Sequence, residues 1–123
     1  MTGEAFAVRR TEAAFLEAAA SIGARLCRDA LWAGKRANWI GSSMEFVDNK
    51  WTAAQRSFGG ELYNGTSGIA LFLGRLFRLT GESEFRATAS GALEHGWSRL
   101  PGMHPNSRHG FYSGALGILY AAL

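Results

Sequence analysis

One internal repeat constrains the fold of this chain more than any other feature of its sequence. Residues 62–71 align without gaps on residues 111–120, at an offset of 49 residues. The matched positions are Tyr63 with Tyr112, Gly65 with Gly114, Gly68 with Gly117 and Ile69 with Ile118. A repeat of about fifty residues that holds two helices is typical of arrays in which neighbouring helix pairs bury one another's faces. The repeat therefore predicts an all-α fold of stacked α/α helix pairs, without strands longer than a few residues.

Each copy of the repeat carries the spacing Gly-x-x-Gly where a helix is expected to begin. Residues three apart lie on the same face of a helix, so both glycines leave one side open to close backbone approach. We therefore predict that residues 63–72 and 112–121 are equivalent helix starts. Each would begin through a turn, at Gly65 and at Gly114.

Hydrophobic periodicity divides the 123 residues into expected elements. Apolar residues recur every three or four positions over residues 11–33, which predicts a first helix. Residues 34–60 hold no clean period and predict a Trp-rich connection, with a helical turn or two near residues 46–56. Trp32, Trp39 and Trp51 are interpreted as core anchors. Residues 61–100 would form the first helix pair, with helices over 66–79 and 83–99, and residues 110–123 would begin the second.

Composition and charge exclude several classes of protein. The 13 Lys and Arg residues against 10 Asp and Glu give a net charge of +3, and the basic residues form no run typical of a nucleic-acid-binding segment. A single cysteine, Cys27, excludes an intrachain disulfide and fits a reducing compartment. The N-terminus has no apolar core of a signal peptide, and the apolar stretch of residues 69–79 is too short for a membrane span. We therefore expect a cytoplasmic protein that binds neither nucleic acid nor a bilayer.

Three stretches of this sequence resemble lanthionine synthetase C-like (LanC-like) domains. Residues 62–73, followed by Leu79-Thr-Gly-Glu82, are similar to the first Gly-x-x-Gly helix of that family, and residues 110–121 to the next one. Residues 32–41 are similar to the opening segment of the cyclase domain in bifunctional lanthipeptide synthetases. The resemblance covers about residues 25–123. It implies a double-layered α/α toroid that adds a cysteine thiol across a dehydrated Ser or Thr of a precursor peptide, which forms a thioether ring.

The resemblance also implies a zinc ion, held by two cysteines and one histidine, that lowers the pKa of the attacking thiol. In the family these ligands come from a Cys and a later Cys-His pair in the closing repeats, and this sequence contains neither motif. No residue is therefore carried over as a zinc ligand or a catalytic group, and no cofactor is expected in this chain. His95, His104 and His109 have no recognisable ligand spacing, and Cys27 is interpreted as a buried, unreactive thiol.

Two residues just before the first Gly-x-x-Gly helix are the expected contacts with substrate. Glu61 and Asn64 would face the central cavity of a complete domain, whose rim meets the precursor peptide in the family. Other carboxylates show no paired spacing typical of acid–base catalysis.

The sequence therefore predicts the N-terminal part of a lanthionine cyclase domain, with residues 1–123 as one partial domain that is inactive alone. The helix over residues 110–123 stops within its apolar stripe at Leu123. Its expected partners are the precursor peptide and the remainder of the toroid. Without that remainder, uncovered apolar residues such as Ile118, Leu119 and Leu123 would cause self-association or low stability. The alternatives are a non-catalytic helical-repeat scaffold that binds peptides, and an α/α-barrel carbohydrate enzyme, which would need a carboxylate pair that we do not find.

Overall fold

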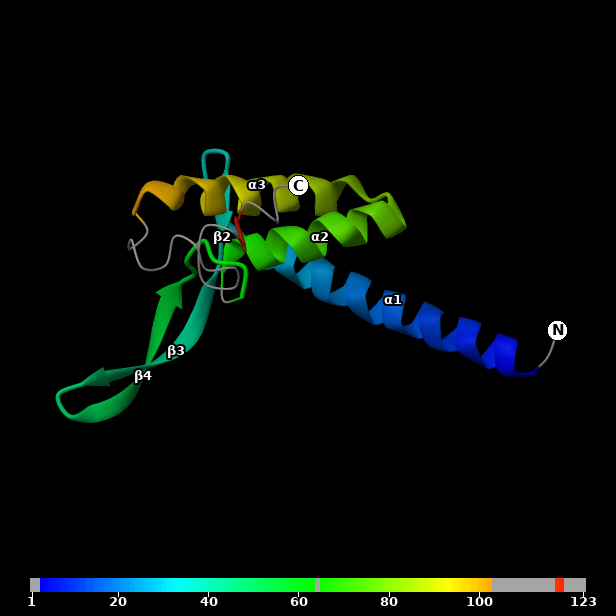
Figure 1. Ribbon diagram of the computed structural model, residues 1–123, viewed down its shortest axis with the longest axis horizontal. Coiled ribbons are helices and arrows are strands. Elements are labelled where there is room, and N and C mark those ends of the chain that lie inside the picture. Colours follow the sequence, from blue (N-terminus) through cyan, green and yellow to red (C-terminus); the bar gives the residue numbers. More distant parts are fainter. Residues whose placement is uncertain (1–2, 64, 103–116, 119–123) are drawn as a thin grey trace.

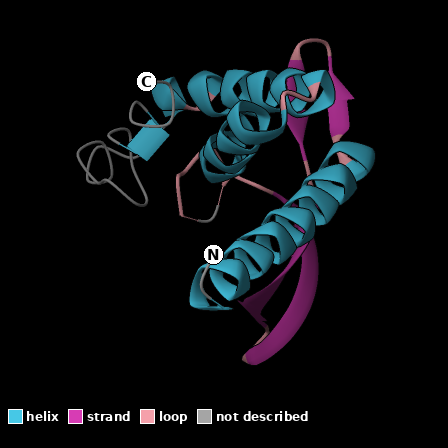
Figure 2. Ribbon diagram, turned by 90° about the vertical axis from the view of Figure 1, so that its right-hand side faces the viewer, coloured by secondary structure: helices cyan, strands magenta, loops and turns pink. Residues whose placement is uncertain are grey.

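The computed structural model describes residues 3–63, 65–102 and 117–118. In chain order the elements are α1 (Gly3–Asp29), β1 (Leu31–Ala33), β2 (Arg36–Asn38), β3 (Ile40–Val47), β4 (Lys50–Ser57), α2 (Thr66–Thr80), α3 (Ser83–Ser98) and the 3-10 turn η1 (Leu100–Gly102). Figure 1 shows α2 and α3 side by side, with α1 running out towards the N-terminus and the β3–β4 hairpin extending the other way. In the view of Figure 2 the same hairpin curves away from the helix pair.

The pair α2–α3 forms because two adjacent segments carry apolar residues at helical spacing. Helix α2 ends at Thr80 and is capped by Gly81, whose backbone N–H donates to the carbonyl of Phe77 at 2.6 Å. Only two residues separate α2 from α3, so the chain folds back and the helices lie against each other. The sequence predicted helices over residues 66–79 and 83–99, and the structure has them at residues 66–80 and 83–98.

The core consists of two clusters on this helix pair. Leu73, Leu76 and Phe85 are buried together against Ala19, Ala20 and Leu26 of α1. A second cluster joins Ala70 and Ala92 to Ala37 and Trp39, which the chain brings in through β2. Burial of large aliphatic and aromatic side chains is the main favourable term in folding, so these clusters hold α1, α2, α3 and β2 together.

Two antiparallel hairpins connect α1 to α2. Strand β1 pairs with β2, and β3 pairs with β4 from Ile40 opposite Ser57 to Val47 opposite Lys50. Asp48 and Asn49 make the tight turn of the longer hairpin, with φ of +52° and +61°. Two successive residues at positive φ are typical of the type I′ turn, whose twist matches that of the flanking strands.

The β3–β4 hairpin, called the ribbon below, is amphipathic. Alternate residues point to opposite faces of a strand, so the register places two kinds of side chain apart. One face carries five apolar residues, one polar pair (Ser42 opposite Gln55) and Ser57 opposite Ile40; the other apolar residues are Met44, Phe46, Trp51 and Ala53. The opposite face carries the charged residues Glu45, Lys50 and Arg56. Arg56 donates from Nε and Nη2 to the two carboxylate oxygens of Glu45.

The prediction of an all-α fold is wrong. Two of the strands have eight residues each, and the residues that the structure describes contain two small antiparallel sheets and no toroid of helix pairs. The Trp-rich connection with helical turns near residues 46–56 is instead the ribbon. The first helix spans residues 3–29 rather than 11–33, because Leu31–Ala33 pairs with β2. The predicted helix start at residues 112–121 falls almost entirely outside the described residues.

Two expectations about burial also need correction. Trp39 is buried and its ring Nε1 donates to the carbonyl of Leu26 at 2.8 Å, but Trp32 and Trp51 are exposed. Ile118, expected to lack a covering neighbour, is fully buried. No helix among the described residues is both long enough and apolar enough to cross a membrane.

Candidate functional site

The loop before α2 is held against the first turn of that helix by the two glycines of the Gly-x-x-Gly motif. A Cβ at Gly68 would overlap the carbonyl oxygen of Leu62, and one at Gly65 would overlap backbone atoms of Glu61. Thr66 donates its backbone N–H to the carbonyl of Gly59 at 2.9 Å. The motif is therefore required by close backbone packing, as the sequence predicted for a glycine pair on one face.

His95 of α3 lies against the same loop and links it to β2. Its Nδ1 is 2.8 Å from the hydroxyl oxygen of Thr66, and its Nε2 is 3.1 Å from the amide nitrogen of Asn38. Burial, followed by the positive charges of Arg99 and Arg36, lowers the pKa of His95, while Glu61 opposes them. These contacts join β2, α2 and α3 through side chains that are 29 and 57 residues from His95 in the sequence.

The Thr66–His95–Asn38 arrangement has the appearance of a catalytic triad but cannot act as one. Thr66 is fully buried, and its hydroxyl lies 3.3 Å from the carbonyl of Gly59, to which it donates. Asn38 presents its NH₂ group to the histidine, whereas a triad needs an acceptor at that place. The three side chains therefore hold the loop in position and do not form a nucleophile.

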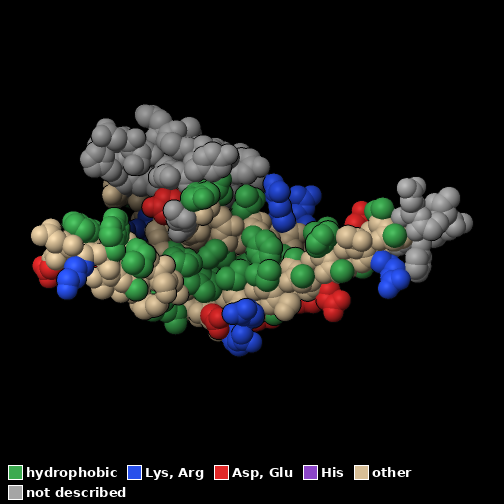
Figure 3. Space-filling view, turned by 90° about the horizontal axis from the view of Figure 1, so that it is seen from below, with side chains coloured by type: hydrophobic (Ala, Val, Ile, Leu, Met, Phe, Trp, Pro, Cys, Tyr) green, Lys and Arg blue, Asp and Glu red, His purple; other side chains and the backbone are tan. Residues whose placement is uncertain are grey.

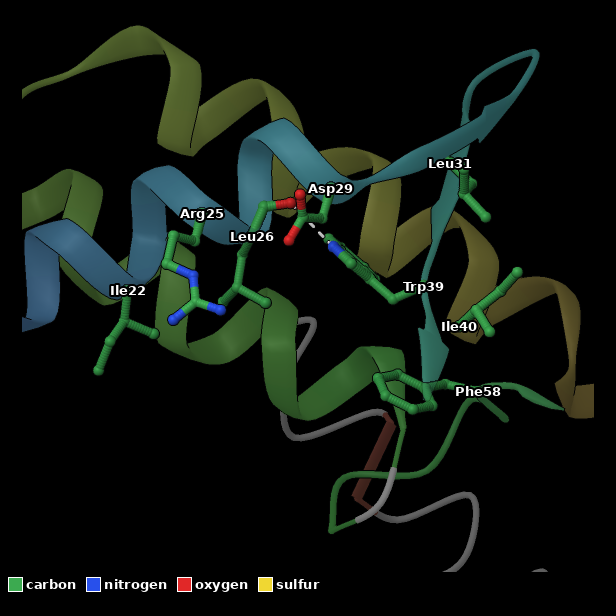
Figure 4. A pocket seen from close by; sticks show the side chains of 8 residues that line it. All are labelled: Ile22, Arg25, Leu26, Asp29, Leu31, Trp39, Ile40 and Phe58. Carbon is green, nitrogen blue, oxygen red and sulfur yellow. Dashed lines mark hydrogen bonds between the residues drawn. The ribbon is translucent and has the colours of Figure 1, made fainter. Parts of the chain in front are cut away.

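Three hollows meet at Phe58, which lines all of them. The first has a volume of about 610 Å³ and lies between α1 and the strands (Figure 4). Figure 4 shows Leu26 and Trp39 joined by a hydrogen bond at its wall, with Phe58 at its lower edge. The second and third have volumes of about 480 and 460 Å³. Besides Phe58, the second hollow is lined by residues of the loop and of α2, including Leu62, Tyr63, Gly65, Gly68, Ile69 and Phe72. The third is lined by the base of the ribbon and the loop that follows it: Gly41, Ser42, Ser43, Arg56, Ser57, Gly59 and Glu61.

These hollows, called the Phe58 groove below, combine apolar walls with a few charges. Arg25 and Asp29 line the first hollow, and Arg56 and Glu61 line the third. Viewed from below, hydrophobic side chains gather over the middle of the molecule and again over the end that the ribbon forms (Figure 3). A concave apolar surface with a few well-placed polar groups is the usual form of a ligand site.

The structure brings several residues singled out by the sequence to this groove. Glu61 is half-buried at the third hollow, and Tyr63 is 73% exposed at the second. Whether Glu61 meets a substrate stays a prediction. Asn64, Tyr112 and Gly114 lie outside the described residues, and Gly117 is buried in a helical segment. Sequence reasoning missed Phe58, Asn38 and Thr66, whose proximity depends on the hairpins that it did not predict.

The described residues do not fit a zinc ion of the kind that the resemblance implies. Both ring nitrogens of His95 already have partners, and the thiol of Cys27 is 3.8 Å from the carbonyl of Glu84. Burial raises the pKa of Cys27, which disfavours the thiolate that binds metal. No group of three His, Cys, Asp or Glu side chains suited to a metal occurs in the part of the chain described. His104 and His109 lie outside it, so the absence of a zinc ligand from the whole chain stays a prediction.

Comparison with known proteins identifies a family. A sequence model of the family described as "Lanthionine synthetase C-like protein" matches residues 57–123, more than half of the chain. The matched part begins next to Phe58 and contains α2, α3 and both copies of the Gly-x-x-Gly motif. No curated protein and no solved structure matches this chain.

Proposed function

The chain belongs to the lanthionine synthetase C-like family, and from this premise we propose that it takes part in thioether-ring formation by binding the precursor peptide. In this proposal the chain is the N-terminal part of a cyclase domain. It holds a dehydrated, cysteine-containing peptide in the Phe58 groove. It does not activate the thiol itself.

The observation that carries the proposal is the position of the groove at the family motif. Gly65 and Gly68 line the second hollow, and their close packing against residues 59–62 places Tyr63 at its edge. A peptide offers apolar side chains together with backbone amides. The apolar walls suit the former, and the charged side chains of Arg25, Arg56 and Glu61 suit the latter.

The surroundings of Cys27 and His95, the candidate nucleophile and base among the described residues, support peptide binding rather than catalysis by this chain. Cys27 lies in the packed face of α1, and burial holds the pKa of its thiol above its ordinary value. Both nitrogens of His95 are occupied in holding Asn38 and Thr66. Thiol activation would have to come from groups other than these.

The same observations favour a second candidate, a non-catalytic peptide-binding member of the family. The two candidates share the groove and differ in turnover. A cyclase part would increase ring formation when the zinc-binding part of such a domain is added, and a binding member would only retain the peptide.

Binding is tested with a synthetic peptide that contains one dehydroalanine and one S-methylcysteine, so that it cannot cyclise. We expect fluorescence anisotropy to detect binding, and Tyr63→Ala to weaken it roughly ten-fold, the scale of an aromatic contact at an interface. The matched control is Leu79→Ala, because Leu79 is 71% exposed, much like Tyr63, but does not line the groove. Equal affinities for the two variants, or no binding by the unaltered chain, would refute the proposal.

Turnover is measured with the unblocked peptide, by following the loss of free thiol. We expect the chain alone to leave the rate at its uncatalysed value, because a free thiol of pKa about 8.5 is only a few per cent thiolate at neutral pH. A rate increase that persists in Cys27→Ser and His95→Gln would show that residues outside these two perform the chemistry. That result would overturn the division between binding and activation.

A further inference from the structure

Asn38 connects His95 to the backbone of Phe58, at the centre of the groove. Its amide nitrogen donates to the carbonyl of Phe58 at 3.0 Å, and its amide oxygen accepts from the N–H of Phe58 at 3.2 Å. The same oxygen accepts from the N–H of Trp39 at 2.7 Å. The side chain of Asn38 thus contacts the Phe58 backbone on both sides, and the N–H of Phe58 also donates to the carbonyl of Trp39 at 3.2 Å.

These contacts fix which way the amide of Asn38 points. Two N–H groups meet its oxygen and one carbonyl meets its nitrogen, so a flipped amide would place like groups together at all three contacts. The second proton of the NH₂ group then points at Nε2 of His95. Nε2 must accept, and therefore carries no proton.

The tautomer of His95 follows from this. A neutral imidazole with a bare Nε2 has its proton on Nδ1, which donates to the hydroxyl oxygen of Thr66. The Thr66 hydroxyl in turn donates to the carbonyl of Gly59. Every donor along this path meets an acceptor, but only while His95 is neutral.

We propose that neutral His95 positions Phe58 through Asn38, so that acidification removes the Asn38 contacts from Phe58 and weakens peptide binding in the groove. This inference rests on the proposed function, because it names the regulation of the same site. His95 and Asn38 are positioning residues: neither lines the hollows, and both act through Phe58.

Protonation of His95 adds an N–H at Nε2 that points at the NH₂ group of Asn38. Two donors then face each other, and Asn38 can relieve the conflict only by giving up its present contacts with Phe58. The charged groups around the ring act in both directions. Arg99, next to the end of α3, and Arg36 of β2 disfavour the imidazolium, whereas Glu61 of the loop favours it. Since Glu61 also lines the third hollow, a change in the charge of His95 affects the groove in two ways, through Phe58 and through Glu61.

The first measurement needs no peptide. In an NMR titration we expect the ring of His95, the side-chain amide of Asn38 and the backbone amide of Phe58 to change with one common midpoint, below the ordinary histidine value of 6.5. Circular dichroism should show helix content unchanged through that midpoint. Separate midpoints, or a cooperative loss of helix at the same pH, would overturn the inference.

The second measurement is the affinity for the S-methylcysteine peptide as a function of pH. We expect it to weaken roughly five- to ten-fold as His95 titrates, the scale of one lost hydrogen bond. His95→Gln should bind with little dependence on pH, because Gln is neutral throughout. The control is the double variant His104→Gln/His109→Gln, which should keep the dependence of the unaltered chain.

The outcomes separate this inference from the function on which it rests. If the peptide binds equally at all pH values, the inference is wrong and the proposed function stands. A pH dependence that survives in His95→Gln has the same meaning. If no peptide binds at any pH, the proposed function fails, and the inference about the groove falls with it even where the NMR midpoints agree.

Discussion

The helix pair α2–α3 buries its large apolar side chains, whereas the ribbon leaves its own in solvent. Phe85 of α3 is 1% exposed, while Phe46 and Trp51 of the ribbon are 59% and 68% exposed. The two regions also differ in their backbone hydrogen bonds, because the ribbon is a sheet of only two strands and each strand has one edge without a neighbouring strand. We infer that the ribbon is held in place by its two ends, at Trp39 and Phe58, and that it contributes little to the stability of the core.

The family match follows the same division. It covers residues 57–123, which include the helix pair and the Gly-x-x-Gly motif but leave out the ribbon's strands except Ser57. The Phe58 groove lies where the two regions meet, because its third hollow has the base of the ribbon on one side and Glu61 on the other. We therefore expect the ribbon and the helix pair to respond largely independently to substitution.

The largest effect is expected for a cavity in the helix pair. Phe85→Ala should lower the free energy of unfolding by roughly 3–5 kcal/mol, because a fully buried ring leaves a space that the packed helices cannot close. Trp51→Ala removes a larger side chain from the ribbon and should cost less than about 1 kcal/mol. Urea unfolding followed by circular dichroism measures both. Similar losses for the two variants would mean that the ribbon is part of the core.

The next effect concerns the motif that the family shares. Gly68→Ala should destabilise the fold by roughly 1–3 kcal/mol, because its Cβ would overlap the carbonyl oxygen of Leu62 and force the loop away. The control is Gly74→Ala, because Gly74 lies in the same helix and no atom is within 4 Å of the Cβ that the substitution adds. It should stabilise by up to about 1 kcal/mol, from helix propensity alone. Thermal unfolding distinguishes them, and a stabilising Gly68→Ala would contradict the close packing.

The helix pair could be predicted from the sequence and the ribbon could not, because only the helix pair buries an apolar face. Helices α2 and α3 were predicted to within about a residue at each end, because their burial requires apolar residues at helical spacing and Gly81 ends the first. The ribbon was missed because its apolar face is uncovered, and Ser42 and Gln55 interrupt its alternation. A signal was present in the pair Asp48–Asn49 between Val47 and Lys50, which is typical of a two-residue turn.

The candidate site was predicted only where it lies in the repeat. The motif indicated Gly65 and Gly68, and with them Tyr63 and Glu61 nearby. Asn38 and His95 are 57 residues apart, and their contact depends on β2 packing against α3. No local pattern in a single sequence encodes such a contact, so the positioning of Phe58 had to come from the structure.

A smaller effect is expected from acid. Burial, then Arg99 and Arg36, lowers the pKa of His95 in the folded state below its ordinary 6.5, so the unfolded chain binds more protons as the pH falls past that value. The contribution of His95 to stability is therefore complete above pH 6.5 and decreases as the pH falls towards the folded-state pKa. Urea unfolding at a series of pH values should show this loss, and His95→Gln should lack it. An identical pH dependence in the variant would assign the loss to other groups.

The smallest effect on overall stability is expected within the ribbon itself. The rings of Phe46 and Trp51 face each other across the strands, with centroids 5.4 Å apart and an angle of 55° between their planes. Such pairs contribute roughly 0.5–1.5 kcal/mol beyond their burial. A double-mutant cycle with Phe46→Ala and Trp51→Ala should give a coupling of that size when it is read from hydrogen exchange of the strand amides. Urea unfolding of the helix pair should be unchanged, because the hairpin can open while Leu73, Leu76 and Phe85 stay packed. A coupling that appears equally in global unfolding would mean that the ribbon and the helix pair unfold as one unit, and the contrast between the two regions would then be wrong.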